Sequence, residues 1–287
     1  DLNASTNADI SNAVQYIFDY ADEVGIASAS CFFERTAMNE KTISRRSLLK
    51  LASASTVTAA AVLPSAVRAA QTDQWDETYE IIVVGAGGAG MAAAVKAAQK
   101  GAKHVVVLEK LNFPGGNTLI SQGFINAADP VRQPKQGIKD SWQHHAEQTL
   151  EAGDFRGQKD RVDVLCRNAY PTIEWLESLG MQFKPKVIQI FGALYPRSHV
   201  PALPKGQGYG TVLSKAAKEL GVEVRTGMGV EEIIREKPFE GDVLGVVAKN
   251  AKGEIKRIRA TRGVVLAAGG FSANKYLREL HDPRVAG

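Results

Sequence analysis

Three glycines, spaced as Gly85-x-Gly87-x-x-Gly90, are the residues of this chain whose type and spacing most directly suggest chemistry. In a nucleotide-binding turn, the first permits a tight turn, the second lets the backbone approach a pyrophosphate, and the third lets a helix pack on a strand. The N-terminus of that helix offers N–H groups and a positive dipole end to the phosphates. Because the chain has 27 glycines, the same spacing could also be an ordinary turn, and its context decides.

The segments on both sides of these glycines predict the elements that would position them. Residues 80–84 are a β-branched run, too short for a helix, that stops at the glycines, which is typical of a buried strand. Residues 91–101 are alanine-rich, with high helix propensity, and end in Lys100 and Gly101, a basic last turn and a glycine stop. We therefore expect a strand, a glycine turn and a helix, in that order.

A carboxylate follows the next buried strand, which we expect at residues 104–108. Glu109 lies about 20 residues beyond the glycines, where an acidic residue binds the hydroxyls of an adenosine ribose. The alternative, a solvated surface charge, fits this position less well. A carboxylate at this place also repels a 2′-phosphate, so the pattern disfavours NADP.

Composition excludes several other classes. The 287 residues are 44% hydrophobic and 23% charged, as in ordinary globular proteins of one large domain or two small ones. The net charge of +4 is dispersed, so nucleic acid is not an expected partner. Cys31 and Cys166 are far apart and no C-x-x-C occurs, so we expect no disulfide framework, no metal site and no c-type haem.

Residues 38–70 have the pattern of a secretory signal peptide. Arg45 and Arg46 precede an apolar run at 48–63 and a small-residue exit, and the run is too short to span a membrane permanently. The segment resembles the twin-arginine export signal, which implies a periplasmic protein carried already folded by the twin-arginine export machinery. The alternative is an amphipathic helix with two chance arginines, but no charged face appears before Arg68.

Residues 1–37 precede this signal and begin on Asp1, with a helix-like stretch at 10–21. A natural signal peptide would begin near Met38. We expect residues 1–37 to be upstream, non-native or disordered sequence, and a short extra helical segment is the alternative.

Two later segments repeat the glycine-rich pattern. Residues 114–117, PGGN, have turn chemistry and allow a second close approach of backbone to ligand. Residues 118–127 mix small and apolar side chains, so we expect a buried segment with something large against it. Residues 263–271 form a last buried strand that ends in paired glycines.

The remaining periodicity predicts three helices and a set of short strands. The helices are expected at 141–153, 158–180 and 211–220, the second capped by Asp154 or Asp160. The strands are expected at 222–225, 230–234, 243–249 and 255–260, the last two paired as a β-meander. Cys166 is interpreted as a buried thiol on the apolar face of the second helix. His199 lies in a loop; it could contact a ligand, but a lone loop histidine is more often structural or solvated.

Four blocks together resemble the flavoprotein subunit family of fumarate reductase and succinate dehydrogenase, most of all periplasmic flavocytochrome c fumarate reductase-like proteins and their urocanate and acrylate relatives. The blocks are VVGAGGAG at 83–90, LEK at 108–110 with GGN at 115–117, EWLESLG at 174–180 and AAGGF at 267–271. The resemblance implies an α/β fold: a Rossmann-like FAD-binding domain over 71–287, with a parallel central sheet and a small β-meander, truncated before the capping domain.

The resemblance also implies where FAD is held. The pyrophosphate would lie on the glycine turn, the adenosine on Glu109 and the last strand, and the ribityl and isoalloxazine end on the second glycine segment. The implied FAD-binding residues are Gly85, Gly87, Gly88, Ala89, Gly90, Glu109, Lys110, Gly116, Asn117, Thr118, Gln122, Gly123, Val230, Ala268, Gly269 and Gly270. Gly123 is also placed near substrate, through its backbone. The histidine that attaches flavin in membrane-bound relatives is absent from 117–119, so the FAD is expected to be non-covalent.

The chemistry implied by the resemblance is hydride transfer from flavin N5 to the double bond of a fumarate-like unsaturated carboxylate. The arginines and histidines that would polarise this substrate are expected beyond Gly287, so no catalytic residue is assigned. With no haem motif, a separate c-type cytochrome is the expected electron donor. The alternatives are a ketosteroid-type FAD dehydrogenase, working in the oxidative direction, and a truncated flavin-binding fragment without activity. A NAD-linked enzyme is disfavoured by the blocks at 115–117 and 268–270.

Overall fold

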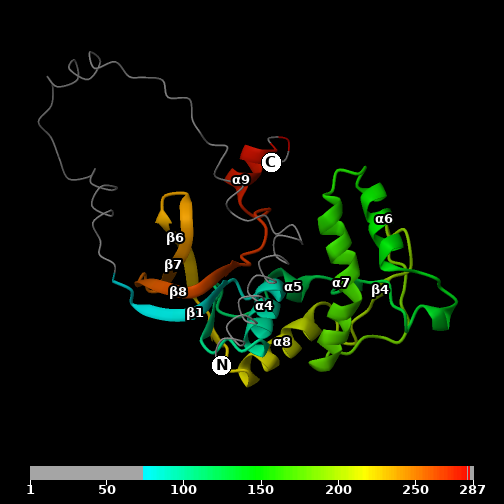
Figure 1. Cartoon of the computed structure of the whole chain (residues 1–287), viewed down its shortest axis with the longest axis horizontal. Helices are drawn as coiled ribbons and strands as arrows, with labels where there is room; N and C mark the ends of the chain where they lie inside the picture. The colour runs from blue at the N-terminus through cyan, green and yellow to red at the C-terminus, as the bar shows by residue number, and fades with distance from the viewer. Residues whose placement is uncertain (1–73, 283, 285–287) are drawn as a thin grey trace, which may run out of the picture.

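The computed structural model describes residues 74–282 and residue 284. The predicted upstream segment, 1–37, and the predicted signal peptide, 38–70, lie outside the described residues. A six-stranded sheet with the order β5-β2-β1-β8-β7-β6 organises the described chain (Figure 1). Its strands are β1 (Glu77–Val84), β2 (Val105–Leu108), β5 (Glu223–Arg225), β6 (Met228–Lys237), β7 (Glu240–Asn250) and β8 (Ile255–Leu266).

Four of these strands are parallel, as predicted for the central sheet. β1 pairs with β2 on one side and with β8 on the other, and β2 pairs with β5. Val84, the last residue of β1, is in register with Leu108 of β2 and with Leu266 of β8. The carboxyl ends of three central strands therefore lie side by side, which is where ligands bind in open α/β sheets.

The predicted β-meander is confirmed as β6, β7 and β8, which pair in antiparallel fashion. Asn250 closes the β7–β8 turn, because its Oδ1 accepts hydrogen bonds from the amides of Lys252 and Glu254 at 2.9 and 3.0 Å. One expectation is corrected: the strands predicted at 255–260 and from 263 onward are a single strand, β8. Residues 255–259 of this strand pair with β7, and the strand pairs with β1 from Ile258 to Leu266, so one extended segment joins the two parts of the sheet.

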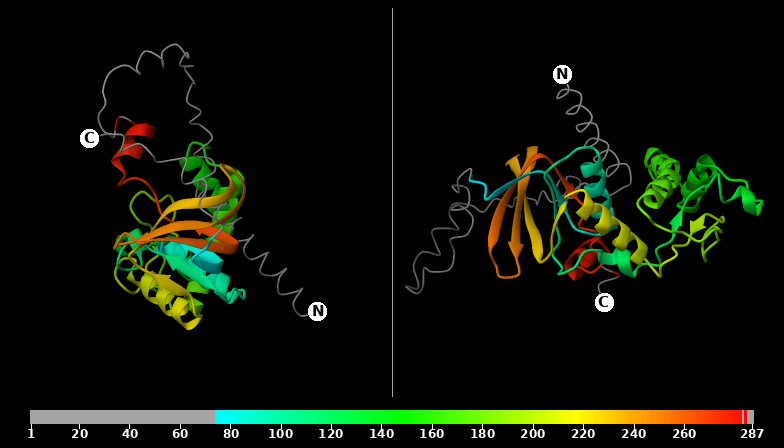
Figure 2. Two further views of the ribbon diagram at one scale, coloured as in Figure 1. Left: turned by 90° about the vertical axis from the view of Figure 1, so that its left-hand side faces the viewer. Right: turned by 90° about the horizontal axis from the view of Figure 1, so that it is seen from below.

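Both faces of the parallel strands are buried, and the two-residue period of a strand divides their side chains between two cores. Ile81 and Val83 of β1 pack on the face covered by the helices α4 (Gly88–Gln99) and α8 (Gln207–Glu219). Ile82 and Val84 pack on the opposite face with residues of the meander. Figure 2 shows α4 and α8 on one side of the sheet.

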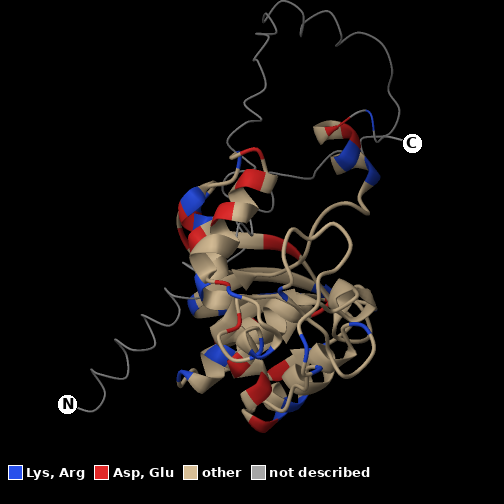
Figure 3. Cartoon of the chain, turned by 90° about the vertical axis from the view of Figure 1, so that its right-hand side faces the viewer, with Lys and Arg blue, Asp and Glu red and all other residues tan. Residues whose placement is uncertain are grey.

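A helical lobe stands beside the sheet (Figure 1). It contains α6 (Trp142–Ala152), α7 (Lys159–Ser178) and a two-stranded antiparallel sheet of β3 (Ile125–Asn126) and β4 (Ser198–His199). The shorter elements are α5 (Gly116–Ile120), the 3-10 helix η2 (Pro134–Gln136) and α9 (Lys275–His281). No helix within residues 74–282 is both long and apolar enough to cross a bilayer. Acidic and basic residues are interspersed along these elements (Figure 3).

The capping of α7 differs from the sequence expectation, and the burial of its cysteine agrees with it. The N-cap of α7 is Gln158; Asp160 lies in the first turn and Asp154 lies before the helix with φ +52°, so neither is the cap. Cys166 on α7 is 1% exposed, whereas its neighbour Leu165 is 40% exposed, which confirms the buried thiol.

Candidate functional site

The turn between β1 and α4 is fixed by the ends of the two neighbouring strands. The amide of Gly85 donates to the carbonyl oxygen of Leu108 at 2.8 Å, and the amide of Ala267 donates to the carbonyl oxygen of Val84 at 2.8 Å. Gly85 has φ +99°, and a Cβ atom there would lie 2.5 Å from the Ala267 carbonyl oxygen. Only glycine therefore fits between β1 and β8 at this turn.

The third glycine of the motif allows α4 to pack on the strand that precedes it. A Cβ atom at Gly90 would lie 1.9 Å from the carbonyl oxygen of Gly85 and 3.2 Å from Cγ1 of Val83. Such a contact is impossible without a shift of the helix. The predicted packing role of Gly90 is confirmed.

The second glycine leaves the N-terminus of α4 open. Gly87 is the N-cap residue and has no side chain of its own to cap the helix, and the first turn contains no acidic residue. Its φ is −71°, and no atom lies within 4 Å of the position that a Cβ would take. The amide of Gly88 is bound from outside the helix, by Oγ1 of Thr118. A helix N-terminus with space beside its cap residue is suited to a pyrophosphate, because the N–H groups left without an intrahelical partner and the helix dipole both favour negative charge.

Glu109 lies directly after β2, beside this turn, and its side chain is buried. Its Oε2 accepts a hydrogen bond from the amide of Ala86 at 2.8 Å, and its Oε1 accepts one from the amide of Leu111 at 2.9 Å. A carboxylate has about four acceptor positions, so these two bonds orient Glu109 without exhausting it. The structure thus places Glu109, which is predicted to bind the ribose, against the glycine turn. The next residue, Lys110, is exposed.

The second glycine segment reaches the same place. The amide of Gly115 donates to the carbonyl oxygen of Ala86 at 2.8 Å, and Gly115 forms an isolated parallel bridge with Gly87. The amide of Gly88 donates to Oγ1 of Thr118 at 2.9 Å, which joins α4 to α5. Gly116 follows with φ +48°, so the chain turns away directly beside the open helix N-terminus.

Residues 118–127 are less buried than the sequence predicts. Part of this segment belongs to α5, and Ile120 and Phe124 are 71% and 38% exposed. Asn117 and Gln122 are exposed as well, whereas Gly123 is buried. The segment contacts the start of α8 through its backbone, and its last residue, Ala127, is buried in a cluster with Ile173 of α7.

The remaining predicted residues lie at the same edge of the sheet. A Cβ at Gly85 would lie 3.2 Å from Cα of Ala268, so the segment 268–270 leaves β8 beside the glycine turn. Gly269 has φ +82°, and neither Gly269 nor Gly270 has an atom within 4 Å of its Cβ position. Val230 is half-buried on β6, a strand that reaches this edge because the amide of Met228 donates to the Glu109 carbonyl oxygen at 2.8 Å.

One aromatic side chain, which the sequence motifs do not single out, lies with these residues. Tyr209, in the first turn of α8, lines a hollow together with Gly87, Gly88, Gly115 and Thr118. The closely spaced glycines around it at 206, 208 and 210 are the only signal in the sequence. They are typical of a loop, and the structure instead begins α8 at Gln207, before the predicted start.

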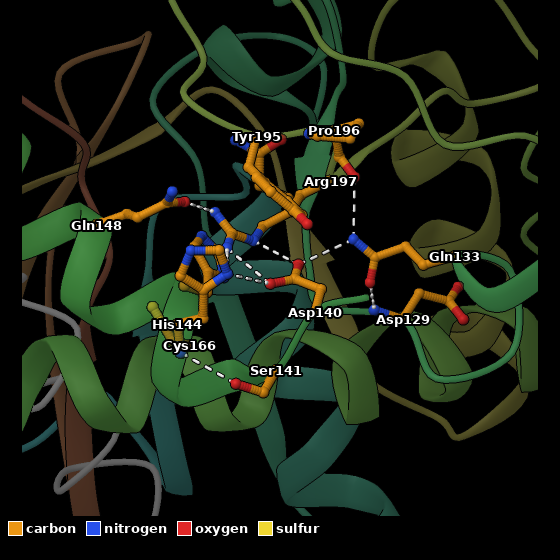
Figure 4. A network of polar contacts seen from close by, with 12 residues as sticks. Asp129, Gln133, Asp140, Ser141, His144, Gln148, Cys166, Tyr195, Pro196 and Arg197 are labelled. Atoms are coloured by element: carbon orange, nitrogen blue, oxygen red, sulfur yellow. Dashed lines mark hydrogen bonds and ion pairs between the residues drawn. The ribbon is translucent and has the colours of Figure 1, made fainter. Parts of the chain in front are cut away.

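A buried polar network holds the helical lobe together (Figure 4). The guanidinium of Arg197 donates to both oxygens of Asp140 at 2.6 and 2.7 Å and to Oε1 of Gln148 at 2.6 Å. Burial disfavours the charged form of Asp140, but hydrogen bonds from Arg197 and Gln133 outweigh it, so the pKa of Asp140 is lowered. Among the described residues, no three His, Cys, Asp or Glu side chains are placed to hold a metal ion.

His199 belongs to the same lobe and is completely buried. Its Nε2 lies 2.8 Å from Oδ2 of Asp129, and its Nδ1 lies 3.0 Å from the carbonyl oxygen of Arg197. The structural interpretation of this histidine is therefore confirmed. The pKa of Asp129 is lowered: burial opposes ionisation, and hydrogen bonds from His199 and from two backbone amides outweigh it.

A strand, a glycine turn and a helix at the carboxyl edge of a parallel sheet, with a carboxylate at the end of the next strand, define a dinucleotide-binding α/β protein. Residues 80–286 match the family described as FAD binding domain, and the chain belongs to this family. The open N-terminus of α4 and the uncovered glycines at 87, 269 and 270 fit the group, and the cofactor is FAD.

Three known proteins show the likeness. The chain is 37% identical over 209 residues to urocanate reductase of Eggerthella lenta, an alignment that covers 72% of this chain and 34% of that protein. The open conformation of a flavocytochrome c3 fumarate reductase matches with TM-score 0.67 and 31% identity, over 77% of this chain and 38% of the other. A 3-ketosteroid-Δ4-(5α)-dehydrogenase from Rhodococcus jostii matches with TM-score 0.65 and 29% identity, over 76% and 51%. The chain therefore spans about half or less of the length of these relatives.

Proposed function

We propose that this chain is the FAD-binding part of an oxidoreductase that reduces the carbon–carbon double bond of a small unsaturated carboxylate. The observation that carries the proposal is the N-terminus of α4, where Gly87 has free space at its Cβ position beside Glu109 and the second glycine segment, in a chain similar to reductases named for urocanate and fumarate. Both of these acids carry a double bond beside a carboxylate.

Different residues would bind different parts of the FAD. The start of α4, from Gly87 to Gly90, binds the pyrophosphate through its amides other than that of Gly88, which donates to Thr118, and Glu109 accepts from the adenosine ribose. The adenosine half is held by Lys110, Val230 and the segment 268–270. The ribityl and isoalloxazine end is held by Gly116, Asn117, Thr118, Gln122 and Gly123.

Bound FAD, in its reduced form, supplies a hydride to one carbon of the double bond, while a proton is added at the other carbon. The chain's own contribution is to orient the flavin and, through the backbone of Gly123, to approach the substrate. The proton donor and the cationic groups that bind the carboxylate are proposed to come from sequence beyond Gly287, as the resemblance implies. The FAD is proposed to be held non-covalently.

A c-type cytochrome is the proposed electron donor, and the periplasm is the proposed compartment. The likeness to a flavocytochrome supports the donor, and the consecutive Arg45 and Arg46 support export by the twin-arginine route. Replacing both arginines by lysine should abolish export, measured as the periplasmic fraction of the chain. Unchanged export of that variant would contradict the route.

A second candidate function is favoured by the ketosteroid dehydrogenase likeness, whose TM-score is almost equal to that of the fumarate reductase. In this alternative the hydride moves from the substrate to oxidised flavin. The two candidates differ in direction, so they can be separated without knowledge of the physiological substrate.

The first experiment is FAD binding to the purified chain, with Gly87→Ala as the test variant. Its φ of −71° and the empty space around its Cβ position mean that alanine is compatible with the fold. If the pyrophosphate lies against Gly87, the methyl group should weaken FAD binding about tenfold or more. Gly153→Ala, at the C-cap of α6 with φ −94° and no contact closer than 3.5 Å, is the matched control.

Equal FAD affinity in the Gly87→Ala variant and the wild type would overturn the placement of the pyrophosphate. For the reaction, the FAD-loaded protein extended by the sequence proposed to carry the proton donor is reduced without oxygen and mixed with fumarate, urocanate or acrylate. Return of the oxidised flavin spectrum supports the reductase. Bleaching of the oxidised flavin by a 3-ketosteroid supports the second candidate instead.

A further inference from the structure

The start of α8 is in direct backbone contact with the segment that leads from α5 to Gly123. A Cβ atom at Gly206 would lie 1.7 Å from the carbonyl oxygen of Thr118, and a Cβ at Gly123 would lie 2.3 Å from the carbonyl oxygen of Lys205. A Cβ at Gly210 would lie 2.5 Å from a methyl group of Leu119. The position of this segment is therefore set by α8.

Tyr209 makes the one side-chain hydrogen bond that the structure shows between α8 and Gly123. Its hydroxyl donates to the carbonyl oxygen of Gly123 at 2.7 Å, across 86 positions of sequence. Burial raises the pKa of this hydroxyl well above its usual range, so it remains a donor throughout the neutral range. The bond fixes the peptide group that follows Gly123, whose φ of +75° is in the left-handed region.

The ring of Tyr209 is itself held in place. It packs edge-on against Phe183, with ring centroids 6.5 Å apart, and Phe183 packs edge-on against the buried ring of His199 at 6.0 Å. The hydroxyl is thereby aimed from a fixed ring. A donor held in this way orients a carbonyl group more firmly than one on a mobile surface side chain, because less rotamer freedom is lost on bonding.

We propose that Tyr209 is a positioning residue that orients the Gly123 peptide at the flavin end of the FAD site. The inference rests on the proposed function, since it takes Gly123 to lie beside the isoalloxazine. It goes beyond the glycine motifs, because Tyr209 belongs to none of them. Its side chain lines the hollow beside Gly87 and Thr118, so it connects the pyrophosphate turn to the flavin end of the same site.

The test is the binding of FAD and of ADP to Tyr209→Phe, which removes only the hydroxyl. One net hydrogen bond corresponds to a change of about fivefold in a dissociation constant. FAD should therefore bind about fivefold more weakly, and ADP, which lacks the flavin, should bind within about twofold of wild type. Tyr195→Phe is the matched control, because its hydroxyl donates to the carbonyl oxygen of Lys139 at the same 2.7 Å.

A purely structural role for Tyr209 predicts another result: FAD and ADP would weaken together, with a lower melting temperature of the free protein. That result, or unchanged FAD binding, overturns the inference. If wild type binds neither FAD nor ADP, the proposed function fails and the inference fails with it. If wild type binds FAD normally, only the inference is at stake.

A second variant tests the Gly123 peptide through the packing of the Tyr209 ring. Phe183→Leu keeps the Tyr209 hydroxyl but loosens the ring that aims it, so FAD binding should weaken at least twofold while ADP binding is unchanged. The visible spectrum of bound FAD should shift in both variants, because the environment of the isoalloxazine changes. Should Tyr209→Phe fail to fold, an FAD-to-ADP ratio in Phe183→Leu equal to that of wild type overturns the inference.

Discussion

His145, on α6, is held in a position that disfavours its protonated form. Its Nδ1 is buried and makes no hydrogen bond within the part of the chain that the structure describes. Burial, together with the positive charge of Arg197, lowers the pKa of His145 from 6.5 to about 4; Asp140 acts in the opposite direction. The histidine is therefore neutral in the folded state down to a pH at which an unfolded chain is already protonated.

The consequence is a loss of stability in mild acid. Between pH 6.5 and about 4, His145 is protonated in the unfolded state but neutral in the folded state. The free energy of unfolding therefore falls as the pH falls through this window. Because the imidazole is partly exposed, we discount the full effect to on the order of 1–2 kcal/mol. His145→Gln should remove this part of the acid sensitivity. The measurement is the free energy of unfolding in urea, at neutral pH and near the acidic end of this pH window.

The control for this prediction is His104→Gln, since His104 is exposed. This variant controls for the loss of an imidazole at an exposed position. Asp129 and Asp140 also have lowered pKa values, so their protonation in acid destabilises the fold. Both residues are present in wild type and in the two histidine variants, so their effect is the same in all three. Equal pH dependence of wild type and His145→Gln would show that His145 does not act in this way.

Removal of Arg197 from its buried ion pair with Asp140 should lower the free energy of unfolding. Their side chains are 5% and 0% exposed, and Arg197→Met leaves the Asp140 carboxylate buried without its partner. Breaking a buried ion pair typically costs about 3–5 kcal/mol. In Arg156→Met the broken pair with Asp154 is exposed, so little change is expected. Urea unfolding of both variants measures the contrast, and comparable stability of the two would contradict it.

These residues also show what sequence patterns cannot supply. Cys166 could be interpreted correctly from the apolar periodicity of its helix. The sequence predicts a loop at His199, which lies instead in β4, although its burial fits the structural alternative. The partners of Arg197 and His199 could not, because Asp140 and Asp129 are 57 and 70 positions away and share no motif with them. Only the folded lobe brings them together.

At the scale of elements, the contact between β1 and α4 depends on one missing methyl group. A Cβ at Gly90 would lie 1.9 Å from the backbone oxygen of Gly85, so Gly90→Ala must displace the helix. Overpacking of this kind costs about 1–3 kcal/mol. Gly87→Ala, three positions earlier in an open site, should leave the free energy of unfolding nearly unchanged. Denaturant melts of the two variants without FAD test the pair, and equal destabilisation would contradict the separate roles.

The elements predicted best are those whose signal is local. β1, α4 and β2 follow from a β-branched run, a glycine turn and an alanine-rich segment. α8 begins earlier than predicted because the glycines at 206, 208 and 210, typical of a loop, serve close packing: a Cβ at Gly208 would lie 2.6 Å from the sulfur of Met181. Tertiary contact therefore outweighs helix propensity at this position.

At the scale of the whole molecule, the α/β class and the glycine-turn side of the site could be predicted from the sequence. Parallel order follows from strands that alternate with helices, and the site follows from the strand ends. The exposed outer side of α5 could not be predicted, because apolar residues such as Ile120 indicate burial whether or not a partner covers them. The structure shows that α8 covers one side of this segment.

The converging strand ends predict that FAD stabilises the described fold as a unit. The glycine turn, the 115–118 segment and the 268–270 segment come from three separate parts of the chain, so a ligand that bridges them binds only the folded state. At a free concentration of 100 times the dissociation constant, such a ligand adds about 2.7 kcal/mol. For a domain of this size that corresponds to a rise in melting temperature of about 5–10 °C.

Differential scanning calorimetry with increasing FAD measures this rise, and the comparison with ADP locates it. ADP reaches the glycine turn and Glu109 but not Gly123, so at equal concentration it should raise the melting temperature less than FAD. Gly87→Ala should show a reduced shift with both ligands, because it obstructs the pyrophosphate that they share. A full shift in that variant would mean that the ligand binds away from the α4 N-terminus. An equal shift from ADP and FAD would mean that the second glycine segment does not contact the flavin half.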